Sequence, residues 1–410
     1  MTRLERLRGS PSVRAILDED LEASARAVTD AVTLPPACYT DPTFYEFESE
    51  AIFYREWLCV GREEQVVDVG DWFSITVVDE PVVVVRADVD RIVAMSAVCR
   101  HRSMIITAPA EATSDQWGAR PPETSGSCLQ FRCPYHFWVY DLDGQLLAAP
   151  EMRKTPGFDK ANVHLPQVKV ETWNGFIFIN FDDDAEPLAP RLVQFSAWLE
   201  NWHLEDMVLG DQGNLIDLPW NWKVMHENSL ESYHSDRLHQ GLHESVPSSG
   251  VVPTPFQDDD AAIVTRVRAS SMDYSLNPTY RALLPVIPTL TEEQRQMTYF
   301  GLVAPTLLIG MNTDSALYRI VLPTGPQTVD IRFGNLFPPG DVHSRRTREI
   351  RRMATAGLLV MTSQDLPTDA AVQKGLRSRF AGRSRYSWQE EPLAHLNRWL
   401  VRRYRAAEQR

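Results

Sequence analysis

The sequence contains no long hydrophobic run and no recognisable export signal. Apolar stretches such as 82–85 and 358–361 are far shorter than the roughly 20 residues that a helix needs to cross a bilayer. The N-terminal residues lack the apolar core of a secretory signal. We therefore expect a cytoplasmic protein that does not insert into a membrane.

The chain has fewer basic than acidic residues, and it has few cysteines. The formal net charge is −14, which argues against nucleic acid or an anionic membrane surface as the main partner. Five cysteines in 410 residues are too few, and odd in number, for a disulfide scaffold. This sparse set indicates a reducing compartment and leaves metal binding as one use for the thiols.

The first half of the chain is rich in strand patterns. Runs of β-branched residues predict short antiparallel strands, and an Asp143-Gly144 pair between apolar residues predicts a hairpin turn; the runs are 73–78, 82–85 and 92–98. We expect residues 57–165 to form a small all-β domain. Residues 108–127 are polar and contain Pro and Gly, and they predict an exposed insertion in this domain.

Residues 166–410 combine strand and helix patterns. Three stretches predict strands separated by Pro and Gly, namely 299–311, 317–322 and 328–337. Apolar residues at helical spacing predict a long helix and a C-terminal helix, marked by Ile350, Met353, Gly357 and Met361 and by Leu393, Leu396, Leu400 and Tyr404. A sheet with long helices predicts an α+β domain. We expect the polar residues 1–56 to form a helical arm that packs on it.

Two pairs of cysteine and histidine form the first candidate site. Cys99 and His101 make a C-x-H motif and Cys133 and His136 a C-x-x-H motif, with 31 residues between them. Two thiolates can bind one iron of a [2Fe–2S] cluster and two imidazoles the other, as in Rieske centres. A zinc site and a chance cluster of core residues are the alternatives, but zinc sites commonly pair cysteines at C-x₂₋₄-C spacing. The pattern favours the cluster, and the extra thiol of Cys128 is expected to be structural.

Two further histidines form the second candidate site. His234 and His239 are five residues apart, which on an ideal helix turns them about 140° from each other. Both can bind one metal only if the helix ends or distorts between them. Asn228, Glu231 and His234 are three residues apart, so we expect them to share a helical face. A zincin motif is excluded because Leu230 stands where HExxH needs its second histidine.

A carboxylate from elsewhere would complete this second site. Two histidines and one carboxylate hold Fe(II) in non-haem oxygenases and leave open positions for O₂. Asp365 is the candidate because Leu358 and Met361 lie on the same face of a helix that we expect Asp365 to close. The alternative is an ordinary surface or helix-terminal aspartate.

The two motifs and their surroundings resemble the catalytic α subunit of Rieske non-haem iron oxygenases. The resemblance runs from about Phe53 to the C-terminus and includes the run of residues 133–144. It implies a Rieske [2Fe–2S] domain followed by a helix-grip (START/Bet v 1-like) catalytic domain, with a mononuclear Fe(II) held by His234, His239 and Asp365.

Roles outside the ligands also come from this resemblance. It implies that Glu231 bridges a cluster ligand, His136, to the iron ligand His234, and that Asn228 tunes the iron from outside its ligand set. It further implies a head-to-tail homotrimer, or a multiple of it, with or without a small β subunit. In such a trimer the cluster of one copy serves the iron of its neighbour.

The implied reaction is mono- or dioxygenation with O₂ as co-substrate. Electrons from NAD(P)H reach the cluster through a separate reductase, with or without a ferredoxin. The sequence fits this division of labour, because no G-x-G-x-x-G motif opens a helix after a strand. A Rieske-type electron carrier or a zinc-binding protein without oxygenase activity is the alternative, and metal analysis would distinguish them.

The substrate stays open between two classes. One is an aromatic or alicyclic ring compound, which needs an apolar pocket, and the other is a quaternary or tertiary amine undergoing oxidative demethylation. An aromatic cage could hold such an amine by cation–π contacts. Aromatic residues in the region expected to form the pocket are Tyr274, Tyr299, Phe300, Tyr318 and Phe333.

Overall fold

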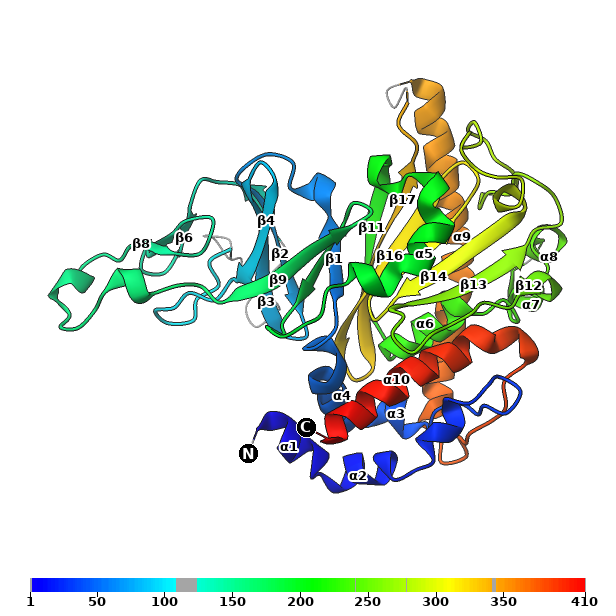
Figure 1. Ribbon diagram of the computed structural model, residues 1–410, viewed down its shortest axis with the longest axis horizontal. Helices are drawn as coiled ribbons and strands as arrows, with labels where there is room; N and C mark the ends of the chain where they lie inside the picture. Colours follow the sequence, from blue (N-terminus) through cyan, green and yellow to red (C-terminus); the bar gives the residue numbers. More distant parts are fainter. Residues whose placement is uncertain (1, 108–123, 240, 278, 341–343, 410) are drawn as a thin grey trace. The chain divides into compact units, whose positions relative to one another are not determined.

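The computed structural model describes residues 2–107, 124–239, 241–277, 279–340 and 344–409. The chain forms two compact units (Figure 1). The larger unit consists of Met1–Leu58 and Glu186–Arg410, and the smaller one of Cys59–Ala185. Within the described residues, no helix combines the length and the apolar character that crossing a bilayer requires.

The smaller unit is built from two β-sheets. One has seven strands in the order β1-β10-β9-β4-β3-β2-β5, and the other has three in the order β6-β7-β8. The strands are β1 Leu58–Arg62, β2 Asp71–Val77, β3 Glu80–Asp88, β4 Arg91–Ser96, β5 Ser125–Ser127, β6 Phe131–Arg132, β7 Val139–Tyr140, β8 Leu146–Ala148, β9 Gln167–Trp173 and β10 Phe176–Asn180. The β-branched runs form β2, β3 and β4, which pair antiparallel as predicted. The predicted turn joins β7 to β8, where Gly144 has a φ of +85° that favours glycine.

Strands of this unit continue past residue 165, where the sequence suggested a domain boundary. β9 pairs with β10 and, through Val168 and Gln167, with β4, so backbone hydrogen bonds tie both strands to the smaller unit. Of the expected insertion, residues 108–123 lie outside the described residues, and Ser125–Ser127 form the edge strand β5. Cys128 is partly buried and packs against the core of the unit.

The larger unit contains an antiparallel seven-stranded sheet in the order β11-β17-β16-β15-β14-β13-β12. Its strands are β11 Val208–Leu218, β12 Val251–Val252, β13 Ala262–Arg268, β14 Met297–Val303, β15 Leu307–Met311, β16 Ala316–Gly325 and β17 Thr328–Phe337. β13 to β17 follow one another as neighbours, whereas β11 crosses over to pair with β17. The strands predicted between residues 299 and 337 are confirmed as β14 to β17.

Helices accompany this sheet, and the predicted α+β class is confirmed. The α-helices among the described residues are α1 Arg3–Arg8, α2 Pro11–Leu17, α3 Ala37–Thr40, α4 Pro42–Glu48, α5 Val193–Leu199, α6 Trp222–Leu230, α7 Ser235–Leu238, α8 Leu242–Ser245, α9 Arg345–Leu376 and α10 Glu391–Gln409. The long helix α9 runs along the sheet and contacts β11, β17 and α6 (Figure 1). This packing sets α6 and α9 beside each other, and the candidate metal ligands lie on or just after these two helices.

A buried ion pair anchors the N-terminal segment in the larger unit. Lys223 Nζ lies 2.7 Å from Glu48 Oε1, and both side chains are fully buried. The same carboxylate accepts hydrogen bonds from Trp222 Nε1 at 2.7 Å and from the Tyr404 hydroxyl. Burying these charges is costly, and the several donors around Glu48 offset that cost. Residues of α4, α6 and α10 therefore share one core.

Candidate metal centres

The two Cys/His motifs of the smaller unit form a matched pair of tight loops. In each loop the carbonyl of the cysteine accepts a hydrogen bond from the amide four residues later, Ser103 after Cys99 and Phe137 after Cys133, both at 3.1 Å. Ser103 and Phe137 both have left-handed backbone conformations, with φ of +55° and +58°. The two loops therefore share their backbone turn, and each of them carries one cysteine and one histidine.

These loops bring the four predicted cluster ligands together. Cys99 and Cys133 are buried, and the rings of His101 and His136 lie with centroids 4.6 Å apart. Burial raises the pKa of the Cys133 thiol, and the neighbouring Cys99 raises it further. The Tyr140 hydroxyl lies 3.3 Å from Cys99 Sγ and also accepts a hydrogen bond from the Arg100 amide. The loops therefore place the two thiols near each other and the two imidazoles next to each other.

The donor set fits a Rieske-type cluster on the chemistry of its atoms. His101 Nδ1 is buried and has no hydrogen-bond partner among the described residues, which is costly unless a ligand uses the nitrogen. Burial, with the nearby His136 and Arg102, lowers the pKa of His101 and so favours the neutral imidazole that binds metals. Trp138 stacks on the His101 ring, with centroids 4.8 Å apart, and holds its orientation.

The second site forms where α6 ends. The sequence suggested that Asn228, Glu231 and His234 share one helical face; this was wrong, because α6 stops at Leu230 and Glu231 is extended. The Thr265 hydroxyl donates to the Leu230 carbonyl and so satisfies a carbonyl at the helix end. The chain then turns, and the short helix α7 separates His234 from His239. The break between the two histidines is the condition that a shared metal requires.

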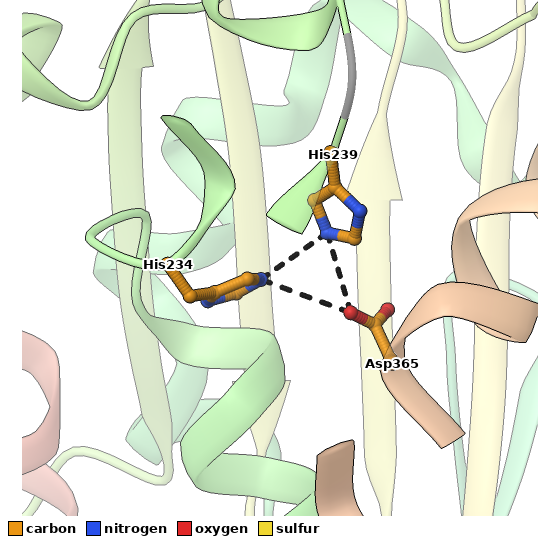
Figure 2. Close-up of side chains that lie close together, drawn as sticks. All are labelled: His234, His239 and Asp365. Atoms are coloured by element: carbon orange, nitrogen blue, oxygen red, sulfur yellow. Dashed lines mark hydrogen bonds and ion pairs between the residues drawn. The ribbon is translucent and has the colours of Figure 1, made fainter. Parts of the chain in front are cut away.

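His234, His239 and Asp365 point toward one another (Figure 2). The two Nε2 atoms are 3.2 Å apart, and Asp365 Oδ1 lies 3.3 Å from His239 Nε2 and 3.9 Å from His234 Nε2. Asp365 Oδ1 is buried and has no hydrogen-bond partner among the described residues. Three ligand atoms that converge in this way, one of them a buried and unsatisfied oxygen, fit a single metal ion with open positions.

Asp365 was expected to close its helix, and this expectation was wrong. Helix α9 continues eleven residues beyond it to Leu376, with Pro367 inside the helix. Proline normally ends or kinks a helix, yet α9 passes through Pro367 without ending there. The expected face is kept nonetheless, since Leu358 and Met361 line the same cavity as Asp365.

Each histidine has a partner for its other ring nitrogen. His234 Nδ1 contacts Glu231 Oε1, and the backbone amide of His234 donates to Glu231 Oε2 at 3.0 Å. His239 Nδ1 lies 2.8 Å from Gln364 Oε1. Sequence reasoning assigned no role to Gln364, although its place next to Asp365 was a usable signal. Such partners fix the orientation and tautomer of a metal-binding imidazole.

Glu231 also sets the charge state of its partner. Burial alone lowers the pKa of His234, but the hydrogen bond and negative charge of Glu231, helped by Asp365 and Asp369, raise it overall. Because a metal binds the neutral imidazole, the raised pKa makes metal binding at His234 compete with protonation. The negative charge at Glu231 then makes the neutral His234 ring a more basic ligand.

A cavity opens next to the three ligand atoms. The empty space within it and at its solvent-open mouth is about 830 Å³. It is lined by Glu231, Asn228, the three candidate ligands and a largely aliphatic wall. Of the five aromatic residues in the region expected to form the pocket, for which ordinary core packing was the alternative, Tyr274 and Phe300 line the cavity. Tyr299 instead packs on Trp202, with ring centroids 5.4 Å apart. The lining therefore offers an apolar pocket with two aromatic rings.

Glu227 is a titratable group of α6, four residues before Glu231 in the sequence. Its carboxylate accepts a hydrogen bond from the Tyr39 hydroxyl. Burial raises the pKa of Glu227 to about 7, against the lowering effects of Tyr39 and Lys223. The folded chain therefore holds this proton more tightly than the unfolded chain does.

We expect Glu227→Gln to stabilise the protein more at pH 8 than at pH 5. When folding raises the pKa of a carboxyl, the folded protein loses stability as the pH rises from the ordinary pKa of 4.5 through the pKa in the folded state. Glutamine keeps an acceptor for Tyr39 but cannot ionise. The gain in free energy of unfolding should grow by about 1–3 kcal/mol between the two pH values. Urea titrations at both pH values check this, and a pH-independent gain would contradict it.

Comparisons with known proteins identify a family for each part of the chain. Residues 56–168 match the Rieske [2Fe–2S] domain family, and residues 199–406 match the family described as ring hydroxylating alpha subunit (catalytic domain). A carnitine monooxygenase oxygenase subunit of Acinetobacter pittii is 33% identical over 53% of this chain and 55% of its own length. A biphenyl 2,3-dioxygenase subunit alpha of Rhodococcus jostii is 34% identical over 51% of this chain and 42% of its own length. The match spans about half the length of these curated relatives.

Solved structures share the fold over almost the whole chain. A quaternary ammonium Rieske monooxygenase in complex with an inhibitor superposes with a TM-score of 0.76 at 23% identity, covering 94% of this chain and 98% of that one. Naphthalene 1,2-dioxygenase from Rhodococcus sp. superposes with a TM-score of 0.72 at 17% identity, covering 97% of this chain and 99% of that one. Since the catalytic-domain family alone accounts for half of the sequence, this chain belongs to the ring-hydroxylating α subunits that carry a Rieske domain.

Proposed function

We propose that this chain is the terminal oxygenase component of a multicomponent enzyme. It uses O₂ and electrons from NAD(P)H, delivered by a separate reductase, to hydroxylate a small organic substrate at a mononuclear Fe(II). The observation that carries the proposal is the convergence of two imidazole nitrogens and one carboxylate oxygen, within 3.9 Å of one another, on the wall of a cavity. That ligand set leaves positions open on one face of the metal.

Two groups of side chains would hold the two metal centres. When bound, the [2Fe–2S] cluster supplies electrons singly and the Fe(II) supplies reductive activation of O₂. The proposed cluster ligands are Cys99, His101, Cys133 and His136, and the proposed iron ligands are His234, His239 and Asp365.

The surrounding residues prepare the iron ligands for this task. Gln364 Oε1 faces His239 Nδ1 and selects the tautomer with a proton there, so that the lone pair of Nε2 points into the site. Glu231 does the same for His234 and adds a negative charge beside it. The aliphatic part of the cavity wall keeps bulk water away from the substrate carbon.

Two substrate classes suit the cavity. Ring compounds fit the aliphatic wall, and quaternary or tertiary amines could pack against Tyr274 and Phe300. The relatives, named for carnitine and biphenyl, represent both classes. A screen of both classes for O₂ uptake matched to product, with a surrogate reductase, tests the proposal. Uptake without any hydroxylated or demethylated product across the screen, or a zinc-only protein, would refute it.

Electron delivery needs a partner protein. We propose a reductase, with or without a ferredoxin, and a homotrimer in which Glu231 connects the cluster of a neighbouring copy to His234. The free thiols suit a reducing cytoplasm. The net negative charge of the chain argues against nucleic acid or an anionic membrane as the main partner. The cavity suits a small organic substrate.

We expect the purified protein with NADH, O₂ and substrate to show no steady turnover. The sequence has no dinucleotide-binding G-x-G-x-x-G motif through which it could accept hydride. Adding a reductase should start O₂ consumption, and adding a heat-denatured reductase serves as the control. Multiple turnovers measured by product formation without any reductase would contradict this division of labour.

A further inference from the structure

An arginine projects into the cavity beside the three candidate iron ligands. Arg319 lies on β16, two residues after Leu317, so both side chains point to the same face of the sheet and both line the cavity. Its guanidinium donates to Thr362 Oγ1 at 2.9 Å and to Ser229 Oγ at 3.4 Å. Thr362 lies one turn before Asp365 on α9, and Ser229 lies near the end of α6. The guanidinium is thus held between the two elements that carry the candidate iron site.

This cation has no carboxylate partner of its own. Among the described residues, no acidic side chain reaches its guanidinium within ion-pair distance, and both of its hydrogen bonds go to neutral hydroxyls. Burial lowers the pKa of Arg319, while Asp365 and Asp369 act on it only over a longer range. Two other cations in the interior of the same unit do have carboxylate partners, Lys223 with Glu48 and Arg403 with Glu56. A guanidinium has five N–H donors, so Arg319 has donors left for a ligand.

We propose that Arg319 is an anion-binding subsite and that the substrate carries a carboxylate. This deepens the proposed function and rests on it, because it names the chemical class that would be oxidised in this cavity. A carboxylate matches the planar fork of a guanidinium and would supply the missing counter-charge in a site sheltered from water. The rest of the substrate would then lie along the aliphatic wall formed by Leu276, Leu308, Leu317 and Leu358, next to the metal ligands.

Binding of acids and their neutral amides tests this directly. Anaerobic titration calorimetry on the holoenzyme would use three matched pairs: benzoate and benzamide, 3-phenylpropanoate and its amide, and 3-(trimethylammonio)propanoate and its amide. We expect at least one acid to bind at least about tenfold more tightly than its amide. If no acid in the panel binds more tightly than its amide, the proposal is overturned.

Three variants assign the preference to this residue. R319Q should remove the acid preference, and R319K, which keeps the charge but loses the fork, should retain only part of it. R266Q is the matched control, because Arg266 lies on β13 of the same sheet but its guanidinium sits over Trp198 and does not line the cavity. R266Q should keep the full preference. If folded, iron-loaded R319Q still prefers the acid over its amide, the proposal is overturned. If R319Q does not fold, an undiminished acid preference in R319K overturns the proposal.

The outcome can be separated from that of the oxygenase proposal. Acids that bind through Arg319 but support no O₂ uptake with a reductase would leave the subsite standing and refute the oxygenase. Amides that bind and are oxidised as well as their acids would leave the oxygenase standing and refute the subsite. Iron content and melting temperature of each variant confirm that the comparison is between folded, loaded proteins.

Discussion

Replacing Asp365 with alanine is expected to lower the iron content from about three to about two atoms per chain and product formation more than about a hundredfold. Asp365 supplies the single carboxylate oxygen that faces both His234 Nε2 and His239 Nε2. Without Asp365, the two imidazoles alone cannot hold Fe(II) firmly. The site also loses the negative charge that would partly neutralise the charge of the metal. Metal analysis and coupled O₂ uptake measure the two effects separately.

Asp369 provides a matched control on the same helix. It lies one turn after Asp365, is equally buried, and its pKa is raised to about 8 by burial and by the charge of Asp365. It does not belong to the group of converging ligand atoms. Asp369→Asn should therefore keep the third iron, and both variants should keep the visible spectrum of the cluster. An Asp365→Ala protein that retains three irons and normal turnover would contradict the assigned ligand set.

The fold was predictable where hydrophobic pattern and local structure agree. β2 to β4 and β14 to β17 are rich in buried β-branched and aromatic residues, and their patterns identified them correctly. β11 was missed because it contains Gly-Asp-Gln-Gly-Asn and is exposed along much of its length, so no apolar alternation marks it. Its strand conformation comes from pairing with β17, a tertiary contact that local sequence does not encode.

The candidate ligands were predictable for a different reason. Their spacing and their resemblance to a known family identified them, whereas their local backbone was not foreseen. The end of α6 depends on Thr265 of β13 reaching Leu230, and the course of α9 through Pro367 depends on packing. Gln364 could have been suspected from its place next to Asp365, but its contact with His239 forms only in the folded chain. Arg319 carries no such signal, because its contacts with Thr362 and Ser229 join residues far apart in the sequence.

The second large effect is expected at Glu231. Glu231→Ala should keep both metal centres and lose turnover by about ten- to a hundredfold. The carboxylate is not one of the three converging ligand atoms, so the third iron should stay bound. It does hold His234 through Nδ1 and the backbone amide, and in our proposal it links the neighbouring copy's cluster to this histidine. Its loss should therefore slow electron transfer into the iron site rather than metal binding.

Single-turnover kinetics separate this role from a merely structural one. After the cluster is reduced and substrate and O₂ are added, the wild-type protein should reoxidise its cluster quickly, and Glu231→Ala should leave it reduced. Glu231→Gln keeps the size of the side chain and one acceptor oxygen but removes the charge. If the charge matters, Glu231→Gln should reoxidise its cluster as slowly as Glu231→Ala. If Glu231→Gln instead transfers electrons at the wild-type rate while Glu231→Ala does not, Glu231 acts only by orienting His234. Rapid reoxidation and normal turnover in Glu231→Ala would remove the bridging role altogether, because the electron would then have another path into the site.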